Sequence, residues 1–120
     1  MTSLLTGLRV LVVEDEPIVA MMLEDMLIEL GCDVIGPAAT VQAGLALVSA
    51  GGFDVAVLDI NINGQRSDPI AYALDRAGKL YTFATGYGSA GLPDCACRDV
   101  IHKPYTLDQL AEALQTLRRG

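Results

Sequence analysis

Acidic side chains follow two apolar runs of the sequence, at the point where each run stops. Glu14 and Asp15 come directly after residues 8–13, and Asp59 comes directly after residues 53–58. Clustered carboxylates repel one another unless a cation is present, and a site of oxygen ligands alone suits Mg²⁺. A carboxylate beside that ion can attack a phosphorus atom as a nucleophile. The spacing therefore predicts a Mg²⁺ site in which Glu14 and Asp15 hold the metal and Asp59 is the nucleophile.

A hydroxyl group and an ammonium group stand at equivalent places further along the chain. Thr85 follows the apolar run 80–84, and Lys103 follows closely on Val100 and Ile101. Charge on the oxygens of a transferring phosphoryl group has to be stabilised by the metal, by Lys⁺ and by hydroxyl or backbone donors. We therefore expect Thr85 and Lys103 to bind phosphoryl oxygens.

Short apolar runs alternate with helical patterns along the whole chain. This alternation predicts an α/β fold in which parallel strands are joined by right-handed crossovers, with helices on both faces of the sheet. In such a sheet function collects at the carboxyl ends of the strands, so the five side chains are expected to meet in one pocket. A helix over 86–93 would be weak, because each glycine there costs about 1 kcal/mol relative to alanine. The predicted strands are 8–13, 32–35, 53–58, 80–84 and 100–101, and the other predicted helices are 17–30, 41–48, 69–77 and 107–119.

Capping residues and chain breakers delimit these predicted elements. Thr106 and Gln109 have the spacing of a capping box at the start of the last helix, and Gly78 is the expected end of the third helix. The Gly36-Pro37 pair is expected to end the second strand. The first helix is expected to bury apolar residues at helical spacing, with the methionines as core packing: Ile18, Met21, Met22, Met26, Leu27 and Leu30.

The composition argues against several classes of protein. The 120 residues leave room for one domain, and we expect a single domain over 1–120 with no output domain. A hydrophobic fraction of 52% argues against disorder, and a formal charge of −7 argues against nucleic acid as a direct partner. No apolar run approaches the ~20 residues of a membrane span, and no signal-peptide pattern begins the chain. The three cysteines are therefore expected to be reduced thiols of a cytoplasmic protein.

The combined pattern resembles the receiver domain of two-component response regulators across essentially the whole chain. It consists of the acidic pair after the first strand, the sequence VLDIN around Asp59, then Thr85 and Lys103-Pro104. The resemblance implies a flavodoxin-like, doubly wound (βα)5 sandwich with sheet order 2-1-3-4-5. It also implies that Asp59 receives its phosphoryl group from a histidine kinase or phosphotransfer protein. A backbone carbonyl of Asn61 would join Glu14, Asp15 and Asp59 on Mg²⁺, and part of the first helix would meet the kinase helical hairpin.

Residues 83–88 read FATGYG and resemble the FATGUY subgroup of receivers. These are often stand-alone proteins of alphaproteobacteria that work with HWE-type histidine kinases. Common receivers have alanine where this chain has Gly86, often an aromatic switch residue where it has Val100, and usually a proline in the loop after the phosphoacceptor. Without an aromatic switch, we expect the glycine-containing segment 86–95 to be mobile and to carry the signal to a protein partner.

Two other functions fit less of the sequence. A degenerate receiver that binds partners without phosphorylation would not need the acceptor positions filled. A Mg²⁺-dependent hydrolase of similar topology would want a second catalytic aspartate where Asn61 stands. Cys95, Cys97 and His102 lack the fourth ligand and the spacing of a zinc site. We therefore expect a phosphoacceptor receiver that catalyses only its own phosphorylation and dephosphorylation.

Overall fold

The computed structural model of the chain describes residues 5–85, 100–102 and 105–119. Five strands form one parallel sheet in the order β2-β1-β3-β6-β7, which is 2-1-3-4-5 when its strands are numbered along the chain. The predicted α/β fold and strand order are confirmed. The sheet strands are β1 (Arg9–Val13), β2 (Asp33–Ala38), β3 (Val55–Asp59), β6 (Leu80–Thr85) and β7 (Val100–His102); β4 (Asn61–Ile62) and β5 (Gln65–Arg66) form a separate hairpin, and the helices are α1 (Pro17–Glu29), α2 (Val41–Ala50), α3 (Asp68–Ala77) and α4 (Leu107–Arg119).

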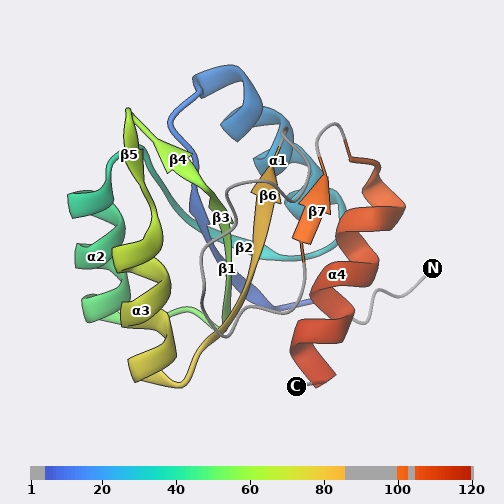
Figure 1. Ribbon diagram of the computed structural model, residues 1–120. Coiled ribbons are helices and arrows are strands. Elements are labelled where there is room, and N and C mark those ends of the chain that lie inside the picture. The colour runs from blue at the N-terminus through green and yellow to red at the C-terminus, as the bar shows by residue number, and fades with distance from the viewer. Residues whose placement is uncertain (1–4, 86–99, 103–104, 120) are drawn as a thin grey trace.

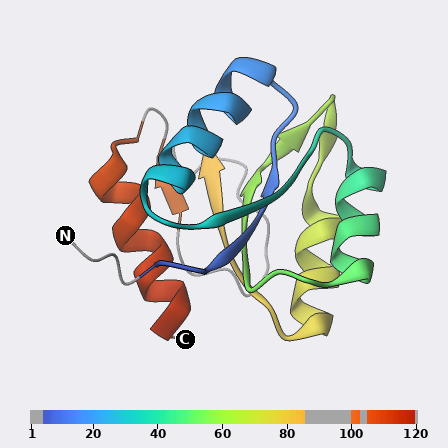
Figure 2. The same ribbon diagram turned by 180° about the vertical axis from the view of Figure 1, so that it is seen from behind.

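Helices cover both faces of the sheet. In Figures 1 and 2, α2 and α3 lie on one face, and α1 and α4 lie on the other. Alternate strand residues point to opposite faces. Ala56 and Leu58 therefore belong to the core under α2 and α3, whereas Val55 and Val57 belong to the core under α1 and α4. Burial on both faces explains why β1 and β3 are continuous apolar runs.

The structure contains the capping interactions that were predicted at the ends of the helices. The Thr40 hydroxyl accepts a hydrogen bond from the Ala43 N–H at 3.0 Å at the start of α2. At the start of α4, Gln109 N–H donates to the Thr106 hydroxyl at 3.1 Å, and the Gln109 side chain accepts from Thr106 N–H at 2.9 Å. Gly78 follows α3 in the left-handed conformation, with φ 71°. The predicted capping box and glycine cap are confirmed.

The second strand does not end where it was predicted to end. β2 continues through Gly36 and Pro37 to Ala38, and its register with β1 shifts at this pair. A bulge of this kind places two residues opposite one, and Gly36 takes a φ of 99° that favours glycine. The prediction was wrong because a glycine–proline pair can occupy a bulge at a sheet edge as well as end a strand.

The predicted buried face of α1 is only partly correct, because Ile18, Met21 and Met22 are exposed to solvent. The helix is buried through Ala20, Leu23 and Leu27, which share one face. Met26 and Leu30 are half-buried against the same core, so Leu27 packs as expected and these two do so in part. Because α1 is apolar on most sides, its spacing alone did not identify the face that meets the sheet. The exposed large side chains of α1 are Ile18, Met21, Met22 and Ile28, at 73%, 61%, 56% and 64% exposure.

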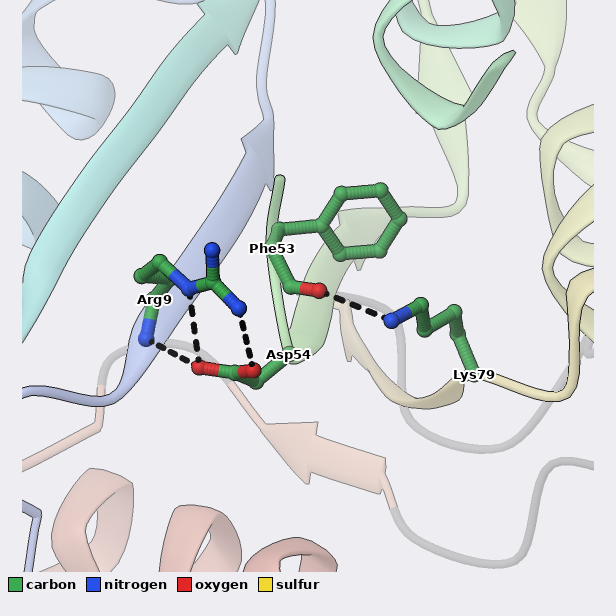
Figure 3. Close-up of polar contacts among 4 residues, drawn as sticks. All are labelled: Arg9, Phe53, Asp54 and Lys79. Carbon is green, nitrogen blue, oxygen red and sulfur yellow. Dashed lines mark hydrogen bonds and ion pairs between the residues drawn. The ribbon is translucent and has the colours of Figure 1, made fainter. Parts of the chain in front are cut away.

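Polar contacts join the starting ends of three neighbouring strands (Figure 3). The backbone N–H of Arg9 donates to Asp54 at 2.9 Å, and the guanidinium donates to both carboxylate oxygens, at 3.0 and 3.3 Å. These hydrogen bonds lower the pKa of Asp54. The ammonium of Lys79 donates to the Phe53 carbonyl at 3.0 Å and lies 5.3 Å from the centre of the Phe53 ring. β1, β3 and β6 are thereby fixed to one another where they begin.

The weak helix predicted over 86–93 lies outside the described residues, as does the segment 86–95 that was expected to carry the signal. None of the helices in the described part of the chain is both long enough and apolar enough to pass through a membrane.

Candidate functional site

Three carboxylates meet at the carboxyl ends of β1 and β3. One oxygen from each of Glu14, Asp15 and Asp59 lies within 4.8 Å of the other two. The two strands are neighbours, and Val13 pairs with Leu58, so the residues that follow this pair, Glu14 and Asp59, come to the same edge of the sheet. The structure therefore brings together the three acids that the sequence singled out.

The three acids differ in burial and in what holds them. Glu14 is only 4% exposed, its N–H donates to the Ala38 carbonyl at 3.0 Å, and its side chain accepts from Glu16 N–H at 3.2 Å. Asp15 and Asp59 are half-buried. A cluster made only of carboxylate oxygens, partly open to solvent, suits Mg²⁺, which takes one or two carboxylates and keeps several waters.

A hairpin that was not predicted stands next to this cluster. Strands β4 and β5 are antiparallel, with Ile62 paired to Gln65 across the turn formed by Asn63 and Gly64. The turn residues have φ angles of 51° and 81°. Two consecutive left-handed residues are what a two-residue type I′ hairpin turn requires, and Asn-Gly is its strongest sequence signal. That dipeptide could have revealed the hairpin.

The tip of the hairpin contacts the acid cluster. The backbone N–H of Asn63 donates to Asp15 Oδ2 at 2.8 Å, between residues 48 positions apart in the chain. A hydrogen bond to an ionised carboxylate is stronger than one between neutral groups. The hairpin is therefore joined directly to one of the expected metal holders.

The structure describes only part of the other predicted site residues. Asn61 is exposed at the first position of β4. Thr85 is the last residue of β6, and the preceding Ala84 pairs with Asp59, so the Thr85 backbone lies at the same edge of the sheet as the acids. The Thr85 side chain and the whole of Lys103 lie outside what the structure describes, and so do Cys95 and Cys97.

Sequence comparison assigns the family. Residues 10–69 match the response regulator receiver domain. The chain belongs to the response regulator receiver family. Receiver domains are signalling modules of two-component systems and are generally not conventional enzymes. They bind Mg²⁺ at an acidic cluster and interact with histidine kinases or phosphotransfer proteins, and this receiver contains such a cluster in Glu14, Asp15 and Asp59.

Individual relatives agree with this assignment. The transcriptional regulatory protein TcrA of Mycobacterium tuberculosis is 34% identical over 96% of this chain, which spans about half (48%) of TcrA's length. The solution structure of SdrG from Sphingomonas melonis Fr1 is 41% identical, with a TM-score of 0.83 over 93% of this chain and 97% of SdrG. A structure of SdrG in its BeF3-activated conformation has a TM-score of 0.77 and covers 98% of each chain.

A more distant receiver shares the fold. The receiver domain of the sensor histidine kinase PA1611 from Pseudomonas aeruginosa has a TM-score of 0.86 at 19% identity, over 96% of this chain and all of that domain. That structure has a magnesium ion coordinated in its active-site cleft. At this identity the likeness concerns the fold alone.

Proposed function

We propose that this receiver accepts a phosphoryl group from a histidine kinase or phosphotransfer protein onto Asp59, and signals to a protein partner by a change of conformation. The observation that carries the proposal is the meeting of three carboxylates from two adjacent strands, with one oxygen of each within 4.8 Å of the others. With Mg²⁺ bound, this cluster would supply the nucleophile and the metal of a phosphoacceptor site.

The chain's own residues divide the chemistry between them. An oxygen of the Asp59 carboxylate attacks phosphorus, an O–P bond forms, and the N–P bond of a phosphohistidine donor breaks. The electron pair returns to the imidazole nitrogen of the donor. Glu14 and Asp15 would hold Mg²⁺, and its positive charge would offset the charge of the carboxylates and of the phosphoryl oxygens. Thr85 and Lys103 are proposed to bind the same oxygens as donors.

The backbone of the hairpin is consistent with Asn61 as a further metal ligand. Ser67 N–H donates to the Ile60 carbonyl at 2.8 Å, one of the two hydrogen bonds of a hydrogen-bonded pair, at the base of the hairpin. Hydrogen-bonded and non-hydrogen-bonded pairs alternate in an antiparallel ladder. The next pair, Asn61 with Arg66, therefore leaves the Asn61 carbonyl outside the ladder, where it is free of a strand partner and can bind a cation.

The exposed apolar surface of α1 is the proposed contact for the kinase. Large apolar side chains that face solvent together often mark a protein interface. The exposed Asp25 and Glu29 stand on the same helix, so a partner with basic residues around an apolar centre would complement it. The resemblance of 83–88 to FATGUY receivers makes an HWE-type kinase the first candidate. The apolar contact residues would be Ile18, Met21, Met22 and Ile28.

Phosphorylation by a cognate kinase, or NMR shifts with beryllofluoride and Mg²⁺, tests the proposal. Asp59→Asn keeps the shape of the side chain but removes the nucleophilic charge, so we expect no label and no beryllofluoride shifts. Asp33→Asn, an equal charge change at an exposed site at the start of β2, is the matched control and should behave like wild type. An Asp59→Asn protein that takes label at the wild-type rate would refute the assignment. Mg²⁺-dependent turnover of a phosphate ester would instead indicate a hydrolase.

A further inference from the structure

The hydrogen bond between the hairpin and Asp15 constrains the side chain that is expected to hold the metal. Asn63 N–H donates to Oδ2 at 2.8 Å. With this oxygen held by a backbone donor, the carboxylate has one preferred orientation toward Glu14 and Asp59. A ligand whose orientation is set by a neighbouring hydrogen bond binds a metal more tightly than one that must be ordered on binding.

The sequence of the hairpin determines where this N–H points. Asn63 and Gly64 both lie in the left-handed region, which fixes the type I′ turn. Ile62 is fully buried and Ile60 is 4% exposed, and both belong to the core under α2 and α3. A register slip would move these side chains out of the core. The turn and the two isoleucines therefore hold the Asn63 N–H against Asp15. Residues 60–67 contain no proline, so each has a backbone N–H to donate.

We propose that Asn63 is a positioning residue for the metal site, and that the Asn63-Gly64 turn sets the affinity of the receiver for Mg²⁺. This inference rests on the proposed function, because it assumes that the acid cluster binds Mg²⁺. The residue acts through Asp15, by its backbone N–H. Its side chain serves only to tolerate the left-handed backbone, which asparagine does more readily than most residues. Loss of a group that orients a metal ligand typically lowers metal affinity about 10–100-fold.

Three variants distinguish a loss of Asp15 positioning from a general loss of fold stability. Asn63→Gly keeps both the N–H and the freedom to adopt positive φ, so its Mg²⁺ affinity should remain within about threefold of wild type. Asn63→Val places a β-branched residue at φ 51° and should weaken Mg²⁺ binding at least ~10-fold. Gly78→Val imposes comparable backbone strain at a left-handed position, with φ 71° in the turn after α3, and should lower stability without changing Mg²⁺ affinity.

Mg²⁺ titrations followed by amide NMR give the affinities, and amide exchange in metal-free protein reports the hydrogen bond itself. The Asn63 amide should be protected in wild type and should exchange faster in Asp15→Ala. If Asn63→Val does not fold, Asn63→Ala, which is less crowded at positive φ, takes its place. If wild type binds Mg²⁺ and Asn63→Val binds it equally well, the positioning role is overturned and the proposed function is not. Wild type that does not bind Mg²⁺ would overturn the proposed function and this inference with it.

Discussion

A variant with one carboxylate of the acid cluster neutralised should be more stable than wild type without metal. With Mg²⁺ present it should be less stable than wild type. Asp15→Asn removes its repulsion from Glu14 and from Asp59, whose nearest ligand atoms lie within 4.8 Å. Two unit charges at that distance repel by about 0.9 kcal/mol in water and about 3.5 kcal/mol at an effective dielectric constant of 20. Glu14 is only 4% exposed, but Asp15 is half-exposed and takes part in both pairs, so solvent screens both and about 1 kcal/mol for each is appropriate.

The hydrogen bond from Asn63 offsets part of this gain. An ionised acceptor makes a bond roughly twice as strong as a neutral one, so the change from carboxylate to amide costs about 1 kcal/mol. The net expectation is that Asp15→Asn raises the free energy of unfolding by about 1 kcal/mol without metal. For a domain of this size, that corresponds to a rise of about 4 °C in Tm.

Mg²⁺ should reverse the order of stability. Wild type gains RT ln(1 + [Mg²⁺]/Kd), which reaches about 1 kcal/mol when Mg²⁺ is about four times its Kd. If the variant binds little Mg²⁺, the two stability curves cross near that concentration. Urea unfolding in EDTA and at rising Mg²⁺ concentrations measures both effects, with Asp33→Asn as the control for net charge. A variant that is less stable than wild type in EDTA, or that gains as much from Mg²⁺, would contradict the reasoning.

Other perturbations test the packing, the caps and a buried thiol. Gly44→Ala would place a Cβ 2.5 Å from the terminal carbon of the fully buried Ile70, and the crowding should cost about 2 kcal/mol. Alanine gains about 1 kcal/mol over glycine inside α2, so the net loss of stability should be about 1 kcal/mol. Ile70→Val should relieve the crowding in the double variant, and urea unfolding that shows additive effects would contradict the clash. Thr106→Ala should cost about 1 kcal/mol by removing a cap of α4, and unchanged urea unfolding would show that the cap contributes nothing. Burial raises the pKa of Cys32 from 9.0 to about 11, so stability should fall as pH rises between these values, because only the unfolded thiol loses its proton there. Cys32→Ala should abolish that part of the pH profile, and an identical profile in wild type and variant would contradict it.

Much of the fold was predictable because local signals agreed with the tertiary structure. The capping pair Thr106 and Gln109 marked the start of α4, and Gly78 marked the end of α3. The alternation of buried strands with helices then restricted the topology to parallel crossovers. Acids at the carboxyl ends of β1 and β3 could be expected to meet, since neighbouring parallel strands end at one edge of a sheet.

Most of the features that the sequence did not predict depend on contacts between distant parts of the chain, and one, the Asn63-Gly64 turn, has a local sequence signal. In α1, apolar residues occur on most sides, and only packing against the sheet selects Leu23 and Leu27 over Met21. The bulge at Gly36 is defined by pairing with β1, which is distant in sequence. The Asn63-Gly64 turn was readable from the dipeptide, but its contact with Asp15 was not, because it joins two loops 48 residues apart.

The polar contacts at the starting ends of β1, β3 and β6 make the sheet harder to open locally at that end than at the carboxyl ends of the strands. Arg9 is bound to Asp54 and Lys79 to the Phe53 carbonyl, so these strands cannot separate at that end without breaking several hydrogen bonds. At the other end, like charges gather within 4.8 Å and favour separation until a cation binds. Small displacements of the carboxyl ends can therefore occur about fixed starting ends. Under the proposed function, phosphorylation would change this edge while both apolar cores stay closed to water, which would limit exposure of strands to aggregation.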